Sequence, residues 1–246
     1  MVLKTTLCLD FGNTRLKCGV FKSDSLAQTV TLSNDIYGDI SNLIKTHKPS
    51  HTILSSVIEH DNNIETLLQA SSIFHKLSYQ SKLPFTSPVG KPETIGADRI
   101  ALVSAAVHLY PNAHTLVIAL GTCITYNFIN KRNEFLGGGI SPGLNMRLQS
   151  LKHYTAKLPL VKPEFNYPLI GYDTATNILS GVIGGMANEI DGFIADYAAL
   201  YGNFNVLLTG GNTSDFAGLL KNKIFADPDL LFKGLYAISE YNDTKT

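Results

Sequence analysis

Hydrophobic and polar positions divide the first half of the chain into three short strands followed by alternating helices and strands. The strands have apolar runs separated by a few polar or glycine residues, whereas the first helix has apolar residues at helical spacing, at Ile36, Ile40, Leu43 and Ile44. A Pro- and Gly-rich stretch at 83–96 predicts irregular structure. The predicted elements are strands at 3–9, 16–22, 26–32, 51–57 and 73–77 and helices at 36–45, 64–70 and 98–110.

The second half repeats the opening order. In both halves a glycine turn, at Gly12 or Gly121, joins the first two strands, and a third strand follows. We therefore expect an α/β protein of two similar lobes, residues 1–113 and 114–246, that face each other across a cleft. The predicted strands are at 115–120, 124–129, 135–140 and 204–209. One helix is opened by the segment 138–143 and runs through residue 151, and two more are predicted at 174–200 and 230–238.

Composition limits the classes of partner. The chain has 246 residues, of which 44% are hydrophobic and 16% charged, and 20 basic residues balance 20 acidic ones. This describes a folded protein and argues against nucleic acid or an anionic membrane as a partner. Three cysteines without a C-x-x-C pair, no secretory signal and no long apolar run predict a cytoplasmic protein.

The segment around the first glycine turn carries the clearest chemistry. Asp10 ends a strand, Gly12-Asn13 can adopt positive φ, and Thr14 and Lys17 supply a hydroxyl and a cation. Backbone N–H groups in such a turn can approach a phosphate, and an ionised carboxylate suits Mg²⁺. The alternative is an ordinary hairpin with a surface lysine.

A second candidate is Asp98, at the start of a predicted helix beside Arg99. A carboxylate there can cap the helix or stand in its first turn, which is a structural role. It can also accept the proton of a substrate hydroxyl during phosphoryl transfer, which otherwise needs positioning and charge neutralisation. Both interpretations stay open from spacing alone.

Two glycine turns in the second half extend the pattern. Thr122 and Thr125 flank the turn at Gly121 and are candidate phosphate donors, although Thr is also a common strand residue. Gly210-Gly211 lets backbone approach a flat ligand, or simply joins a strand to a helix. The sequence has no G-x-x-x-x-G-K-[ST] or G-x-G-x-x-G motif, and its seven histidines lack metal-ligand spacing.

Taken in order, these segments resemble the type III pantothenate kinase family over nearly the whole chain. The matching motifs are Asp10-Phe11-Gly12-Asn13-Thr14-Arg15-Leu16-Lys17, Gly96-Ala97-Asp98-Arg99, Gly121-Thr122 with Thr125, Gly138-Gly139-Ile140-Ser141-Pro142-Gly143, residues 153–159, Asp173-Thr174 with Ser180-Gly181, and Thr209-Gly210-Gly211. The resemblance implies a duplicated ribonuclease-H-like fold of the actin, acetate and sugar kinase and Hsp70 superfamily. It also implies ATP-dependent phosphorylation of pantothenate to 4′-phosphopantothenate, the first step of coenzyme A biosynthesis.

The resemblance assigns roles to residues of this chain. Asp98 would accept the proton of the pantothenate hydroxyl, and Asp10 would face Mg²⁺ through phosphate or water. It further implies a homodimer and a monovalent cation, K⁺ or NH₄⁺. The ATP contacts would be Asp10, Phe11, Gly12, Asn13, Thr14, Arg15, Leu16, Lys17, Gly121, Thr122, Thr125, Gly210 and Gly211. The pantothenate contacts would be Gly96, Ala97, Asp98, Arg99, Thr174 and the position of Val89.

The chain departs from the family pattern at two positions. Ala119 stands where the family has an aspartate assigned to the monovalent cation, and Val89 stands where it has a tyrosine beside pantothenate. These departures leave open a catalytically weak nucleotide-binding or regulatory protein on the same scaffold. A kinase for another small alcohol is a third hypothesis.

Overall fold

The computed structural model describes residues 4–243 and divides them into two compact units. Unit 1 comprises residues 4–111, 133–135 and 229–243, and unit 2 comprises residues 112–132 and 136–228. The first boundary lies close to the one expected at 113. The last helix, expected in the second lobe, instead belongs to unit 1.

Unit 1 is built on a five-stranded sheet with the order β3-β2-β1-β4-β5. β1 is antiparallel to β2 and parallel to β4, so the three opening strands form a meander and the next two are added by helical crossovers. The strands are β1 (Thr5–Phe11), β2 (Leu16–Lys22), β3 (Ser25–Thr31), β4 (His51–Ser56) and β5 (Ile73–Lys76). The first predicted strand, 3–9, starts at residue 3, which lies outside the described residues.

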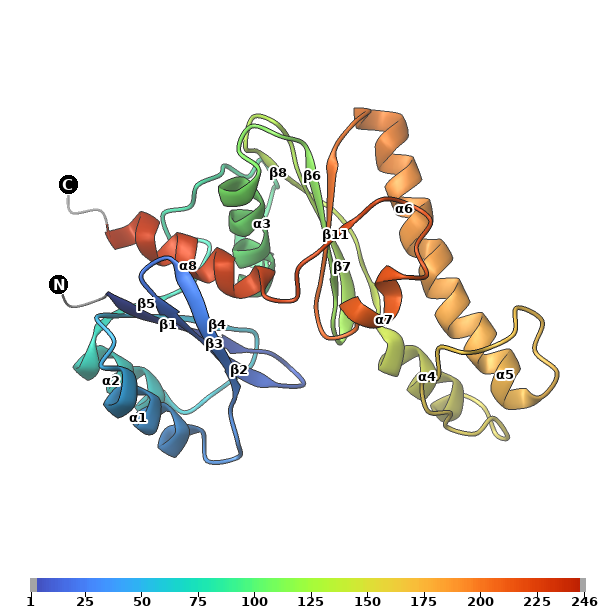
Figure 1. Ribbon diagram of the computed structural model, residues 1–246, viewed down its shortest axis with the longest axis horizontal. Coiled ribbons are helices and arrows are strands. Elements are labelled where there is room, and N and C mark those ends of the chain that lie inside the picture. The colour runs from blue at the N-terminus through green and yellow to red at the C-terminus, as the bar shows by residue number, and fades with distance from the viewer. Residues whose placement is uncertain (1–3, 244–246) are drawn as a thin grey trace. The chain divides into compact units, whose positions relative to one another are not determined.

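Helices cover both faces of this sheet (Figure 1). Leu7, Leu9 and Phe11 of β1 share a core with Ile40 of α1 (Ile36–His47) and residues of α2 (Asn62–Ser71). The alternate residues of β1, Asp10 among them, face the other side because side chains of a strand alternate between faces. On that side lie α3 (Ala97–Leu109) and α8 (Leu230–Asp243), and α8 stacks Tyr236 on Phe21 of β2.

Unit 2 repeats this topology. Its sheet has the order β11-β10-β6-β7-β8, in which β6 is antiparallel to β7 and parallel to β10, while β9 pairs with β7. The expected duplication is therefore confirmed. The strands are β6 (Thr115–Leu120), β7 (Cys123–Ile129), β8 (Phe135–Gly137), β9 (Ile140–Pro142), β10 (Asn205–Thr209) and β11 (Phe225–Ala226).

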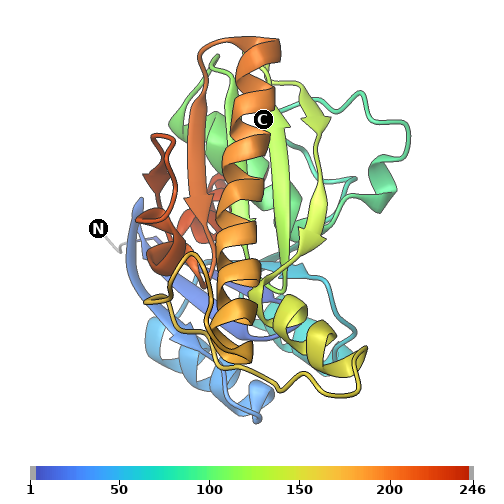
Figure 2. The same cartoon turned by 90° about the vertical axis from the view of Figure 1, so that its right-hand side faces the viewer.

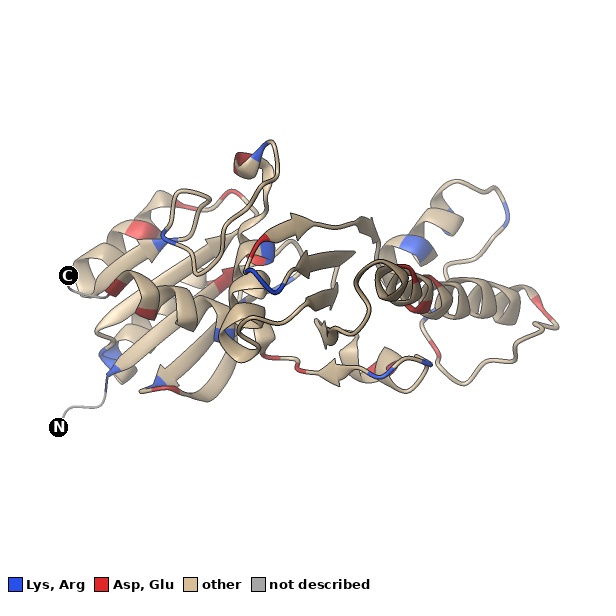
Figure 3. Cartoon of the chain, turned by 90° about the horizontal axis from the view of Figure 1, so that it is seen from above, with Lys and Arg blue, Asp and Glu red and all other residues tan. Residues whose placement is uncertain are grey.

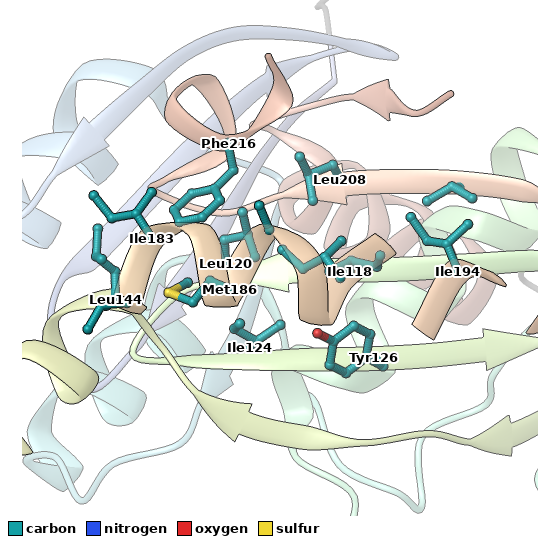
Figure 4. Packing of buried hydrophobic residues seen from close by; sticks show 14 of the residues in the cluster. Ile118, Leu120, Ile124, Tyr126, Leu144, Ile183, Met186, Ile194, Leu208 and Phe216 are labelled. Atoms are coloured by element: carbon teal, nitrogen blue, oxygen red, sulfur yellow. The ribbon is translucent and has the colours of Figure 1, made fainter. Parts of the chain in front are cut away.

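One long helix supplies most of the cover of the unit 2 sheet (Figure 2). Ile183 and Met186 pack on Ile118, Leu120 and neighbouring core residues, as Figure 4 shows. The helical elements of this unit are α4 (Leu144–His153), α5 (Thr174–Leu179), the π-helical segment η2 (Ser180–Gly184), α6 (Gly185–Tyr201) and α7 (Thr213–Ala217). The helix predicted at 174–200 thus exists, with one π-helical turn inside it.

The strand predicted at 135–140 is wrong in one respect, because the structure breaks it into β8 and β9. Gly137 and Gly138 have φ values of 93° and 151°, and a β-carbon at Gly138 would lie 1.9 Å from the Tyr126 carbonyl oxygen. Only glycine fits there. The short elements η1 (Pro92–Thr94) and β11 were not expected, since each has too few residues for a period to show. Helix α7 follows Gly210-Gly211, where the sequence predicted a turn from a strand to a helix.

Charged residues of both signs are interspersed along each unit (Figure 3). Within residues 4–243, none of the helices combines the length and apolar character needed to cross a membrane.

Candidate active site

The first glycine turn connects β1 to β2 and presents a short exposed loop. The Gly12 N–H donates to the Arg15 carbonyl oxygen at 3.2 Å, and Asn13 and Thr14 are exposed. The turn does not use positive φ at Gly12 or Asn13, contrary to the expectation. A β-carbon at Gly12 would make a tight contact with the Arg15 carbonyl oxygen at 3.2 Å and an ordinary one with Asp10 Oδ2 at 4.0 Å.

Asp10 stands one residue before this turn, in a row of polar side chains across three strands. It pairs with Lys17 of β2 on one side and with Ser55 of β4 on the other. Burial raises the pKa of Asp10 to about 7, the negative charge of Asp98 adds to the rise, and Lys17 opposes it. Asp10 and Asp98 are therefore close enough to repel each other.

Asp98 lies in the first turn of α3 but is not its N-cap. The N-cap is Gly96, which has no side chain to bond the helix, so the capping interpretation of Asp98 is wrong while the first-turn position is confirmed. A β-carbon at Gly96 would lie 2.5 Å from Asp98 Oδ1. Burial raises the pKa of Asp98, although the Arg99 backbone N–H and guanidinium partly offset this. A carboxyl of raised pKa suits a proton acceptor.

The residues around Asp10 fit a hard divalent cation. The Asp10 carboxylate supplies an oxygen ligand, and the hydroxyl of neighbouring Ser55 is buried without a hydrogen-bond partner. Within residues 4–243, His, Cys, Asp and Glu nowhere gather in groups of three that could hold a metal. A cation here would thus take its other ligands from phosphate and water, as Mg²⁺ commonly does.

An irregular segment leads to Asp98 and encloses a small pocket in unit 1. The pocket has a volume of about 240 Å³. Its lining includes Tyr79, Phe85, Pro92, Ile95 and Ile100, the last two of which bracket Gly96, Ala97, Asp98 and Arg99. The Arg99 guanidinium lies 5.5 Å from the centroid of the Phe135 ring, which holds it by a cation–π contact. Val89, partly buried, belongs to the same segment.

In unit 2 three glycines bring separate segments together around the second turn. The turn itself closes with a bond from the Gly121 N–H to the Cys123 oxygen at 3.0 Å, and Thr122 is exposed. A β-carbon at Gly143 would lie 2.2 Å from the Gly121 oxygen, and one at Gly210 would lie 2.5 Å from the Leu120 oxygen. Gly210 also has φ of 101°, so its place after β10 requires glycine.

The residues predicted around this turn therefore differ in access. Gly121, Thr122 and Gly211 are exposed, whereas Thr125 is buried on β7 and accepts a hydrogen bond from Asn127 Nδ2 at 3.1 Å. Similarly, the Phe11 side chain is buried in the unit 1 core, so only its backbone faces the first turn.

Ala119 is the counterpart of Asp10 in the duplicated topology. It stands two residues before Gly121, as Asp10 stands two before Gly12, and it pairs with Thr125 of β7 and Thr209 of β10. Unit 2 thus has the row Thr209-Ala119-Thr125 where unit 1 has Ser55-Asp10-Lys17. The alanine leaves two hydroxyl groups without the carboxylate between them.

Thr174 begins α5 and lies in a separate pocket of unit 2. Asp173 caps this helix with a capping box, which fixes the position of Thr174. The pocket has a volume of about 610 Å³ and is lined also by Arg147, Leu158, Asn177 and Gly181. Nothing in the structure assigns Thr174 a partner.

Ser55, Arg147 and Glu189 were not predicted from the sequence. Ser55 could have been found, because it ends β4 at the level where Asp10 ends β1. Arg147 and Glu189 are 42 residues apart and form an ion pair that no local pattern indicates.

Comparisons with known proteins give a consistent result. The sequence profile of the type III pantothenate kinase family matches residues 6–196. A type III pantothenate kinase from Christiangramia forsetii is 41% identical over 241 residues, which cover 97% of this chain and 99% of the relative. One from Cytophaga hutchinsonii is 41% identical over 238 residues, which cover 96% and 99%.

Solved structures support the fold. A Campylobacter jejuni protein of the Baf family is 22% identical, covers 96% of this chain and 98% of its own, and has a TM-score of 0.63. A ROK family glucokinase from Streptomyces griseus is 12% identical, covers 97% and 99%, and has a TM-score of 0.52. Together with the duplicated sheets, these likenesses show the fold of the actin and sugar kinase superfamily.

Proposed function

The chain belongs to the type III pantothenate kinase family, and from this premise we propose that it phosphorylates pantothenate with ATP, the first step of coenzyme A biosynthesis. The observation that carries the proposal is the pair of carboxyl groups at Asp10, beside the first glycine turn, and Asp98, at the start of α3. Burial raises the pKa of Asp10, and the negative charge of Asp98 adds to the rise. As a member of a kinase family, the protein uses ATP and a divalent cation.

The reaction moves the γ-phosphoryl group of ATP to the primary hydroxyl of pantothenate. A new P–O bond forms to that hydroxyl oxygen, the bond to the bridging oxygen of ADP breaks, and the hydroxyl proton is transferred to Asp98 Oδ. Such transfers depend chiefly on positioning and on neutralising the charge of the phosphoryl oxygens. Asp98 can accept the proton because burial raises its pKa above that of an exposed carboxyl.

Unit 1 supplies the phosphate and metal groups in this proposal. The backbone of Phe11, Gly12, Asn13, Thr14, Arg15 and Leu16 approaches the phosphates, and Lys17 adds a positive charge. Asp10 would hold a Mg²⁺ ion, whose charge would relieve the repulsion between Asp10 and Asp98. The unpartnered Ser55 hydroxyl supports this, because a ligand or metal-bound water would satisfy it.

Roles in unit 2 and in the substrate site follow the family motifs. We assign Gly121, Thr122, Thr125, Gly210 and Gly211 to ATP; Thr125 acts through the sheet that holds the turn, since its side chain is buried. We assign pantothenate to Gly96, Ala97, Arg99, Val89 and Thr174. The exposure of Thr174 and the glycine at position 96 are compatible with these roles.

We also propose that the protein acts as a cytoplasmic homodimer. Within the described residues, the segment before α5 exposes large apolar side chains, with Leu169, Ile170 and Tyr172 each more than four-fifths exposed. Apolar residues in such a cluster are typical of a surface that another chain covers. A monovalent cation near Ala119 stays a proposal whose test is given in the Discussion.

The alternative of a weak nucleotide-binding regulator rests on Ala119 and Val89 and gains no support from the comparisons. The relatives that match nearly the whole chain are kinases, and Asp10, Lys17, Asp98 and Arg99 are all present. The departures at Ala119 and Val89 remove none of these four side chains.

Turnover and binding by an Asp98→Asn variant test the function. ADP release with pantothenate should be measured for the wild type and the variant, and ATP binding should be titrated separately. We expect wild-type turnover that requires pantothenate and a fall in kcat of about 10²–10⁴-fold in the variant, the usual contribution of a positioned base. ATP affinity should change little. Absence of pantothenate-dependent turnover by the wild type would contradict the proposed function.

A further inference from the structure

A partly buried polar network in unit 2 connects elements near the second glycine turn. Arg147 of α4 donates from Nε to the Pro142 carbonyl oxygen at 2.7 Å and from Nη2 to Ser141 Oγ at 2.7 Å. The same Nη2 bonds Glu189 of α6. One guanidinium therefore holds the end of β9, the start of α4 and the middle of α6.

Glu189 is bound on its other oxygen by β7. The Tyr126 hydroxyl donates to Glu189 Oε1 at 2.9 Å, and the Tyr126 ring is fully buried and stacked on Phe193 with centroids 4.0 Å apart. Burial raises the pKa of Glu189, but bonds from Arg147, Ser141 and Tyr126 outweigh it, so the pKa is below its usual value. Glu189 is ionised at neutral pH and paired on both oxygens.

The network reaches the turn through Gly143. β9 pairs with β7 from Cys123 onward, immediately after the turn. The Gly143 N–H, between β9 and α4, donates to the Thr122 carbonyl oxygen at 3.0 Å, and the Arg147 N–H donates to the Gly143 oxygen at 3.0 Å. A shift of β9 or of the first turn of α4 would therefore move the backbone of Thr122.

We propose that Arg147, Glu189 and Tyr126 form a clamp that positions the Gly121-Thr122 turn for ATP. These are positioning residues, because none of them needs to touch the nucleotide. The clamp fixes β9 and α4 against α6. The hydrogen bond from the Gly143 N–H to the Thr122 carbonyl oxygen then fixes the turn relative to these elements. The inference rests on the proposed function, in which Thr122 contacts ATP.

Its charge balance explains why the clamp is rigid. A half-buried carboxylate with a single partner would still be destabilised by the loss of water around its second oxygen. In Glu189 both oxygens are paired, one with the Arg147 guanidinium and one with the Tyr126 hydroxyl, and this offsets the cost of burial. Arg147 and Glu189 expose only 22% and 23% of their side chains, so the pair is partly shielded from salt. Loss of either Arg147 or Glu189 leaves the other charged side chain without its partner, so that it must be hydrated. The elements that the ion pair joined can then move apart.

The test uses variants that do not line the Thr174 pocket. Glu189→Gln keeps the shape of the side chain but removes its charge, and Tyr126→Phe removes only the hydroxyl. A matched control is Asp191→Asn, on the same helix, whose carboxylate accepts from the Lys221 and Asn222 N–H groups instead. For each full-length variant the Kd for ATP, measured without pantothenate, is compared with KM for ATP, KM for pantothenate, kcat and Tm.

We expect Glu189→Gln to raise Kd and KM for ATP by roughly tenfold, a modest result for a displaced binding group. KM for pantothenate should change less than twofold. Tyr126→Phe should have a smaller effect of the same kind, and the double variant should be little worse than Glu189→Gln because both act through one network. Asp191→Asn should lower Tm without changing Kd for ATP.

Three results would overturn the clamp. If Glu189→Gln lowers Tm while Kd for ATP stays within twofold of the wild-type value, the network contributes to stability alone. Equal changes in Kd for Glu189→Gln and Asp191→Asn would show the same. A wild type that binds no ATP would overturn both the clamp and the proposed function, whereas a wild type that binds ATP without turnover would overturn the function alone.

Discussion

The Asp98 carboxylate folds back against the α-carbon of Gly96, so closely that a β-carbon at Gly96 would lie 2.5 Å from Asp98 Oδ1. Gly96 has φ of −58°, which alanine adopts without strain. A β-carbon at Gly96 would therefore displace the Asp98 carboxylate without straining the backbone. This relationship separates the position of Asp98 from the stability of α3.

Gly96→Ala should displace the Asp98 carboxylate and lower kcat by about tenfold or more, since misplacing a catalytic group costs activity steeply. Stability should fall by no more than about 1 kcal/mol, because Gly96 is the N-cap of α3 and alanine is a poorer N-cap residue than glycine. Steady-state kinetics and urea unfolding measure the two effects. An equal loss of ATP affinity and of stability would mean that the change disturbs the fold and not the carboxylate alone.

Ala119→Asp should restore in unit 2 the carboxylate that unit 1 has at Asp10. The new side chain would stand between the hydroxyls of Thr125 and Thr209, which together offer oxygen ligands to a monovalent cation. We expect kcat/KM for ATP to become more dependent on K⁺ than in the wild type, measured in KCl against NaCl at equal ionic strength. Ala119→Asn, which adds an uncharged side chain of similar size, is the matched control. An unchanged response to K⁺ would show that the cation is bound elsewhere or not required.

Stability should decline in acid through Asp243. Hydrogen bonds from Lys4 and His51 lower the pKa of Asp243, outweighing a small opposing effect of burial. Because the pKa in the folded protein is below the unfolded value near 3.9, the contribution is complete above that value and is lost as pH falls through the folded pKa. The difference in unfolding free energy between wild type and Asp243→Asn should therefore be constant from pH 7 to about 5 and shrink below about 4. Urea unfolding at several pH values checks this, and a difference that persists at pH 3 would exclude an ionic origin.

Two glycines in helices should respond to alanine in opposite directions. A β-carbon at Gly234 of α8 would lie 1.9 Å from the Ala101 carbonyl oxygen of α3, whereas one at Gly192 of α6 would meet nothing within 4 Å. Gly234→Ala should destabilise by about 1–3 kcal/mol or more, the usual cost of overpacking. Gly192→Ala should stabilise by about 0.5–1 kcal/mol through helix propensity. Thermal unfolding of both variants makes the comparison, and similar shifts for the two would contradict the close contact of α3 and α8.

The sequence predicted most elements because their periods are long and clear. The strands of β1, β2 and β6 and the helix α1 have unbroken apolar patterns, and the matching glycine turns at Gly12 and Gly121 revealed the duplication. What failed depended on contacts between distant segments. The break at Gly138 follows from the nearness of the Tyr126 oxygen, and the place of α8 in unit 1 follows from its packing on α3.

In the candidate site, too, the features that depend on contacts between distant segments could not be predicted from the sequence. Asp10 and Asp98 were found as candidates because each begins or ends an element, but their mutual repulsion appears only when the sheet and helix are folded. The Arg147–Glu189 pair joins α4 to α6 and leaves no local trace in the sequence. The assigned roles of Thr174 and Val89 rest on motifs and stay predictions.

The return of the chain to unit 1 has a consequence for synthesis on the ribosome. Strands β1 to β5 are made well before helix α8, which covers Gly19 and Phe21 on one face, and Phe232 of α8 lies 2.9 Å from where a Gly19 β-carbon would stand. Domains that lie contiguously in a sequence can mature while translation continues. Here strands β1 and β2 must wait, with this side covered only in part by α3, until residues 230–243 have been made.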